Sequence, residues 1–201
     1  MQPNPFQPLP ESVEIGGGSY PINSDFRMGV AIETEILAGD KPDVLGLLST
    51  FYCGAIPQDV EAAVDRMVWF YSCAPDEGQT GDKKGGRHYD FEIDKDVLLA
   101  SFLTAYGIDL TAASLHWWAF RRLMLNLPPD TPFMERVKYR CADLKKLSKE
   151  ERKHYKKMQA LYAIKKHPAQ AHMTVEERDA ALREKIRRRY EEAQKHREES
   201  Q

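Results

Sequence analysis

Residues 88–127 form the most apolar stretch of the 201-residue chain, and this stretch constrains the fold most strongly. Within it, residues 95–106 place apolar side chains almost all round a helical period, and residues 115–127 form a second apolar segment with two tryptophans. A helix that is apolar on all sides normally lies at the centre of its fold. Gly107 ends the first segment and a Pro-Pro pair at Pro128 ends the second. The stretch therefore predicts two core helices and a mainly α protein.

Helical periodicity predicts four further helices around this pair. They run from about residue 24 to Gly39 and over residues 42–52, 57–71 and 132–146. Near the N-terminus, two short segments of alternating apolar and polar residues flank the glycine run 16–18, which is typical of a small β-hairpin. We expect a helical bundle of about five or six helices with a small N-terminal β-hairpin and a long charged C-terminal helix.

The two ends of the chain differ in composition from its middle. Four prolines among the first ten residues predict a flexible lead-in over 1–10, followed by a helical body over 11–146. Residues 147–201 predict a basic helical extension, in which a Thr-x-x-Glu capping box opens a charged helix over 174–198. Residues 1–133 hold 9 Lys and Arg against 19 Asp and Glu, and the remainder holds 20 against 12. The net charge of −2 therefore conceals an acidic body (−10) and a basic tail (+8).

Several classes of protein are not expected from this composition. No run of 18 apolar residues exists, so we expect no membrane-spanning helix. The first residues carry neither a basic nor an apolar signal region, which predicts a cytosolic protein. The three cysteines are widely spaced and odd in number, so a disulfide framework is not expected. The glycine-rich segment 74–87 lacks the phosphate-loop pattern, so no nucleotide site is expected there.

Candidate chemical groups concentrate around residues 88–96. The His-Tyr-Asp-Phe-Glu cluster at 88–92 and the acidic residues up to Asp96 match no zinc or calcium ligand spacing, so we interpret them as a strand or a turn that leads into a helix capped by Asp94. His116 could act as a general base, but no nucleophile motif accompanies it, which favours a packed histidine. We therefore expect no catalytic, cofactor-binding or metal-binding residues, and no enzymatic activity.

The adjacent tryptophans on residues 115–127 are the strongest candidates for contact with a partner. Tryptophans in so apolar a segment usually belong to the core. Successive residues on a helix point about 100° apart, however, so we expect one of the two indoles to face outward. The candidate partner-binding residues are Trp117, Trp118, Arg121 and Arg122.

Several motifs together resemble one phage protein family. They are Asn-Ser-Asp-Phe-Arg at 23–27, the Y-D-F-E-x-D motif with A-S-F-x-x-A-Y-G-I-D-L over 89–110, L-H-W-W-x-F at 115–120, and the pair Tyr139-Arg140 before a Lys-rich helix. The chain resembles, over roughly residues 11–164, the family named after gene product fifteen of long-tailed phages and prophages of Gram-positive bacteria.

This resemblance implies a role in tail assembly. Members of the family resemble tail assembly chaperones, which bind the tape measure protein before the tail tube polymerises and are then replaced by the major tail protein. It implies a protein of the host bacterial cytoplasm that is not part of the mature virion. The family carries no agreed catalytic residues, and the segment 174–198 lies outside the shared pattern.

Two other functions remain open at this point. The basic tail could bind nucleic acid, but its interspersed acidic residues make this the less favoured alternative. A virion structural protein, such as a tail or connector subunit, is the other alternative. The opposite charges of body and tail also predict self-association, in which the basic arm of residues 147–198 meets the acidic body of the next copy.

Overall fold

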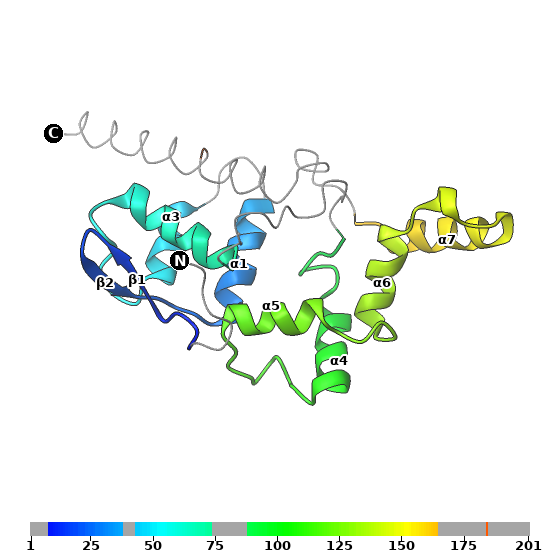
Figure 1. The fold of residues 1–201 in the computed structure, drawn as a ribbon, viewed down its shortest axis with the longest axis horizontal. Helices are drawn as coiled ribbons and strands as arrows, with labels where there is room; N and C mark the ends of the chain where they lie inside the picture. The colour runs from blue at the N-terminus through cyan, green and yellow to red at the C-terminus, as the bar shows by residue number, and fades with distance from the viewer. Residues whose placement is uncertain (1–7, 38–42, 74–87, 165–183, 185–201) are drawn as a thin grey trace. The chain divides into compact units, whose positions relative to one another are not determined.

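A computed structural model describes residues 8–37, 43–73, 88–164 and residue 184 of the chain (Figure 1). Within these residues the protein has seven α-helices and one two-stranded sheet, so the mainly α expectation is confirmed. The chain forms two compact units. The first unit contains the described residues up to 73 together with 115–120 and residue 184, and the second contains 88–114 and 121–164. None of the described helices is long and apolar enough to cross a membrane.

The predicted hairpin opens the first unit. Strands β1 (Ser12–Ile15) and β2 (Gly18–Pro21) pair antiparallel around a two-residue turn. Gly16 and Gly17 occupy this turn with φ of 58° and 81°, a conformation that residues with a side chain rarely adopt. Val13 and Ile15 are buried, and β1 packs on α3 (Figure 1). This contact supplies the support that a lone hairpin needs.

Three helices complete most of the first unit: α1 (Phe26–Leu37), α2 (Val44–Phe51) and α3 (Val60–Tyr71). The helices predicted over 42–52 and 57–71 are confirmed, but each begins one residue after an aspartate that caps it. Asp43 accepts a hydrogen bond from the Gly46 N–H, and Asp59 accepts one from the Ala62 N–H. The end predicted at Gly39 lies outside the described residues.

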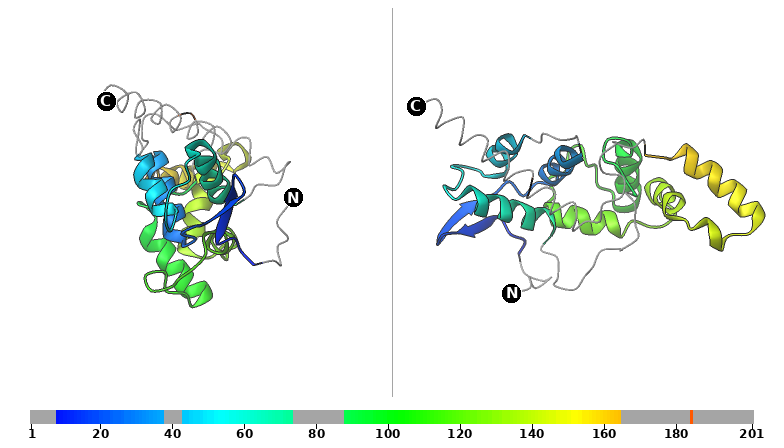
Figure 2. Two further views of the ribbon diagram at one scale, coloured as in Figure 1. Left: turned by 90° about the vertical axis from the view of Figure 1, so that its left-hand side faces the viewer. Right: turned by 90° about the horizontal axis from the view of Figure 1, so that it is seen from above.

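The second unit is built mainly from helices that follow residue 94. They are α4 (Lys95–Tyr106), the end of α5 (Trp117–Leu125), α6 (Pro132–Cys141), the 3₁₀ turn η1 (Leu144–Lys146) and α7 (Lys149–Leu161). Helix α4 packs on α6, and α6 packs on α7 (Figure 2). The first four residues of α5 belong to the first unit, so this helix contributes to both units.

Two expectations about these helices are corrected by the structure. The helix predicted over 132–146 ends at Cys141, because Asp143 accepts a hydrogen bond from the Lys145 N–H and begins the separate turn η1. Helix α4 is not buried on all sides: Phe102 is fully buried, but Leu103 is 56% exposed. One face of α4 packs on α6, and the Tyr106 hydroxyl in its last turn donates to the Leu123 carbonyl of α5 at 2.9 Å.

Other expectations for the chain ends are not tested. The long charged helix predicted over 174–198 lies, apart from the helical residue 184, outside the described residues, as do the glycine-rich segment 74–87 and most of the lead-in. The division into a lead-in, a body and a basic extension stays a prediction.

Candidate functional site

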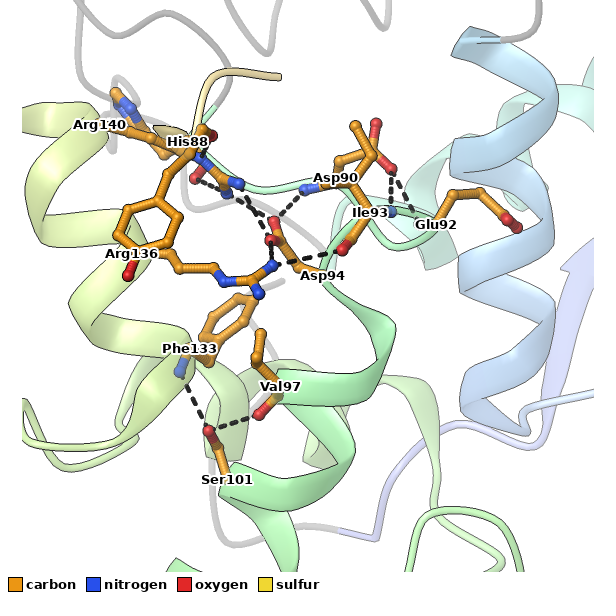
Figure 3. Close-up of polar contacts among 11 residues, drawn as sticks. His88, Asp90, Glu92, Ile93, Asp94, Val97, Ser101, Phe133, Arg136 and Arg140 are labelled. Atoms are coloured by element: carbon orange, nitrogen blue, oxygen red, sulfur yellow. Dashed lines mark hydrogen bonds and ion pairs between the residues drawn. The ribbon is translucent and has the colours of Figure 1, made fainter. Parts of the chain in front are cut away.

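The turn before α4 forms one side of a buried polar cluster, which Figure 3 shows in close-up. The Asp90 carboxylate accepts hydrogen bonds from the N–H groups of Glu92 (2.8 Å) and Ile93 (3.0 Å). The Asp90 N–H in turn donates to Asp94 Oδ2 at 3.0 Å. These bonds close residues 90–94 into a turn, one of the two forms expected from the sequence, and direct the Asp94 carboxylate towards α6. Asp94 occupies the N-cap position of α4, but its side chain forms no capping hydrogen bond, because the carboxylate is bound by other groups.

Two arginines of α6 complete the cluster. Arg136 and Arg140 are four residues apart and therefore lie on the same face of this helix. Arg136 Nη1 lies 2.9 Å from Asp94 Oδ1, Arg140 Nη2 lies 3.0 Å from the same oxygen, and Arg140 Nη1 donates to Asp94 Oδ2. The Asp94 side chain is 1% exposed, and those of Arg140 and Arg136 are 6% and 28% exposed. We call this group the Asp94 clamp.

The electrostatics of the clamp keep Asp94 ionised. Burial alone raises the pKa of the Asp94 carboxyl, but the side-chain hydrogen bonds from Arg140 and Arg136 oppose this effect. Together with the backbone hydrogen bond from Asp90 and the charge of Arg140, they lower the pKa of Asp94 below its usual value. A charged aspartate that forms ion pairs with two arginines is suited to holding structural elements together rather than to transferring protons.

Arg140 extends the clamp to the end of α7. Its Nε donates to the Tyr162 carbonyl at 2.6 Å, and its Nη1 also donates to the His88 carbonyl at 3.1 Å. One guanidinium group thus connects the turn before α4, helix α6 and the residue that caps α7. A second link lies nearby, where Ser101 Oγ donates to the Val97 carbonyl and accepts the Phe133 N–H at 3.1 Å. Buried hydrogen bonds and ion pairs therefore join the turn before α4 and helix α4 itself to helix α6 in the second unit.

The clamp was not predicted from the sequence, although Asp94 and Arg140 both belong to motifs that the sequence shows. Asp94 is the last residue of the Y-D-F-E-x-D motif, and Arg140 belongs to the Tyr139-Arg140 pair that was noted separately. A buried carboxylate requires a cationic partner. The sequence signal for that partner was the pair Arg136 and Arg140, which lie four residues apart on one face of an otherwise half-buried helix.

The two tryptophans lie in the interior of the first unit. Trp117 is 0% exposed and Trp118 is 2% exposed, so the expectation that one indole faces outward is wrong. The last turn of α3 covers both rings: the Trp117 Nε1–H donates to the Tyr71 carbonyl at 2.8 Å, and the Trp118 Nε1–H donates to the Phe70 carbonyl at 2.7 Å. These carbonyls are among the last of a helix, which lack partners within it. Both indole N–H groups therefore supply hydrogen bonds to carbonyl groups at the C-terminal end of α3.

The two arginines that follow remain candidates. Arg121 is partly buried, and Arg122 is exposed on the outer part of α5. Leu125, one turn after Arg122 and on the same side of the helix, is 63% exposed. The end of α5 thus presents a basic and apolar surface in the second unit. The partner-binding role of Arg121 and Arg122 stays a prediction.

His116 is packed, as the sequence analysis favoured. Its Nδ1 accepts the Trp118 N–H at 3.0 Å, so the proton of the neutral ring lies on Nε2, which is 2.9 Å from the Pro10 carbonyl oxygen. Both ring nitrogens are therefore engaged in the fold. Among the described residues no group of three His, Cys, Asp or Glu side chains is arranged to hold a metal ion.

Comparison with known proteins connects these observations. The sequence pattern of the bacteriophage Gp15 protein family matches residues 6–164. The chain belongs to this family. The matched region spans the hairpin, the residues of the Asp94 clamp and all of α7. No curated protein and no solved structure matches the chain. The resemblance expected from the sequence is confirmed, and the protein is phage-related.

Proposed function

We propose that this protein is a tail assembly chaperone that binds the tape measure protein and keeps it available until the tail tube forms. The observation that carries the proposal is the match to the bacteriophage Gp15 family across residues 6–164, since this family resembles tail assembly chaperones. The protein then acts in the host cytoplasm, is replaced by the major tail protein, and does not remain in the mature virion.

Exposed apolar side chains in the second unit support a binding role. Four of them are at least 45% exposed, namely Ile93, Leu103, Leu125 and Leu161. A partner with a long apolar helical surface gains free energy when such side chains are covered, at about 25 cal/mol per Å² of apolar area. Arg122 beside Leu125 adds a cation that suits an acidic residue of the partner.

Co-expression with the tape measure protein of the same phage or prophage tests the proposal. We expect the two proteins to co-purify and the tape measure protein to move from the insoluble to the soluble fraction. Leu103→Asp is expected to weaken this effect, because it places a charge in an apolar contact. Thr104→Asp is the matched control, since Thr104 is the next exposed residue on α4 and is already polar. Equal solubility with and without the protein contradicts the proposal.

Two measurements separate this function from its alternatives. Mass spectrometry of purified particles is expected to lack the protein, whereas a tail or connector subunit would be present. Binding to duplex DNA that falls steeply with salt would favour a nucleic-acid role instead. The gene order offers an independent check, because the reading frame of a tape measure protein is expected directly downstream.

A further inference from the structure

The outward face of α7 carries a concentrated positive charge. The inward face of this helix packs on α6: the Tyr155 ring lies 4.9 Å from the Tyr139 ring, and Gln159 Nε2 donates to the carbonyls of Tyr139 and Ala142. The opposite face carries five exposed cations. They are Lys149, Arg152, Lys153, Lys156 and Lys157, and we call them the lysine face.

No carboxylate lies within the lysine face itself. At about 100° per residue its five cations occupy an arc of about 140°. Glu150 lies about 20° beyond the Lys157 edge of this arc, and Glu151 is used in the capping box with Ser148. Within the described part of the chain none of the four lysines forms an ion pair, and Arg152 donates to the carbonyls of Leu144 and Leu147 instead. Like charges at i and i+4 destabilise a helix, so an anionic partner would stabilise this face.

The first unit carries the opposite charge. Its described residues hold ten Asp and Glu but only two basic side chains, Arg27 and Arg66, which gives a net charge of −8. The exposed acidic side chains are distributed over the hairpin, the start of α2 and α3, and they include Glu11, Glu14, Asp43, Asp59 and Glu61. Each copy of the chain therefore presents a cationic helix on one unit and an acidic surface on the other.

We propose that the lysine face of α7 docks on the acidic first unit of a second copy, so that the copies associate head to tail. Such a contact is heterologous, and each added copy leaves one free surface of each kind. A protein surface fits the lysine face better than nucleic acid does. The face consists mainly of lysines and has no aromatic side chain within its arc on which a base could stack. This proposal does not depend on the identity of the tape measure protein as a partner.

The mass of the full-length protein in solution tests the association. Light scattering coupled to size exclusion is expected to give a multiple of the monomer mass at about 0.1 M salt and the monomer mass at about 1 M, because the Debye length falls from about 10 Å to about 3 Å. The monomer mass at both salt concentrations overturns the proposal, and it would also be the result if α7 met the first unit of its own chain. A large mass that collapses on nuclease treatment overturns it in favour of nucleic acid.

A charge reversal identifies the surface. The triple variant Lys153→Glu, Lys156→Glu and Lys157→Glu is expected to be monomeric at low salt while its circular dichroism shows an unchanged helix content. The matched control reverses three exposed lysines outside α7 and changes the net charge by the same amount. This control, Lys95→Glu, Lys138→Glu and Lys146→Glu, is expected to remain associated. Association that survives the α7 reversal overturns the proposal.

Mixing two variants tests the partner surface. The variant Glu11→Lys, Glu14→Lys and Glu61→Lys makes the first unit less acidic, and it is also expected to be monomeric alone. When it is mixed with the α7 reversal variant, its unchanged lysine face meets the unchanged acidic first unit of the other variant, so a complex of the two variants is expected to form. Failure of the mixture to associate overturns the pairing of α7 with the first unit.

Discussion

Asp94→Asn removes the negative charge at the centre of the clamp and changes little else. The asparagine has the same size and keeps one oxygen that can accept a hydrogen bond from an arginine. Arg140, whose side chain is 6% exposed, is then left without a neutralising charge. Loss of one partner from a buried ion pair costs about 3–5 kcal/mol. We expect the substitution to lower the free energy of unfolding by about 3 kcal/mol, the lower end of this range. The reason is that Arg136 is 28% exposed and can recover part of its hydration.

The pH dependence of this loss follows from the pKa of Asp94. The pKa of this carboxyl is lower in the folded protein than in the unfolded chain. Its contribution to the free energy of unfolding is therefore complete above the unfolded pKa of about 4, and it falls as the pH drops towards the folded pKa. The Asp94→Asn variant has no such contribution. The difference in stability between wild type and variant is thus constant near neutral pH and narrows below about pH 4.

Urea unfolding followed by circular dichroism measures this difference. With a slope of about 2 kcal/mol per M, a loss of about 3 kcal/mol lowers the midpoint by about 1.5 M. Hydrogen exchange is expected to show the loss of protection in the turn 88–94 and in α6. Asp96→Asn is the control, because Asp96 is an exposed acid in the first turn of the same helix. The reasoning is refuted if the two variants have the same urea midpoint at pH 7. It is also refuted if the difference in stability between wild type and Asp94→Asn does not decrease below about pH 4.

Three further substitutions test other contacts. Gly29→Ala is expected to destabilise the first unit by about 1–3 kcal/mol and to shift the tryptophan emission, since a Cβ at this position would overlap the Trp117 ring. Tyr106→Phe is expected to cost about 0.5–1.5 kcal/mol by thermal unfolding, because its hydroxyl bonds to carbonyls at the C-terminal end of α5. Ser148→Ala removes a capping box and is expected to cost about 1 kcal/mol, visible as faster hydrogen exchange in the first turn of α7. Unchanged stability in any of these variants contradicts the corresponding contact.

The secondary structure was largely predictable because it depends on local signals. The glycines of the hairpin turn and Gly107 after α4 each act within a few residues of their position. The aspartates that cap α2 and α3 act as locally, but they were not recognised as caps, so both helices were predicted to begin too early. Gly107 has φ of 66°, and its N–H bonds to the Leu103 carbonyl at 3.0 Å while that of Ile108 bonds to the Phe102 carbonyl, which is the predicted helix end. Signals of this range are contained in one short stretch of sequence.

The site residues were less predictable because their partners are distant in the sequence. Asp94 meets Arg140 across 46 positions, and Trp117 meets Tyr71 across a similar separation. Helical geometry correctly separates Trp117 from Trp118 by about 100°, but it does not show that one helix end can cover both rings. The partner of a side chain depends on how the elements pack, and the periodicity of a single helix does not contain that information.

The error about α4 bears directly on the proposed function. Its composition predicts burial on all sides, yet the fold leaves Leu103 of this helix 56% exposed. A single exposed leucine is common in soluble proteins and carries little weight. Among the described residues, however, four of the five large exposed apolar side chains belong to the second unit and one, Leu45, to the first. The second unit therefore holds more apolar surface than its own core uses, and this excess makes it, rather than the buried tryptophans, the better place to look for the partner.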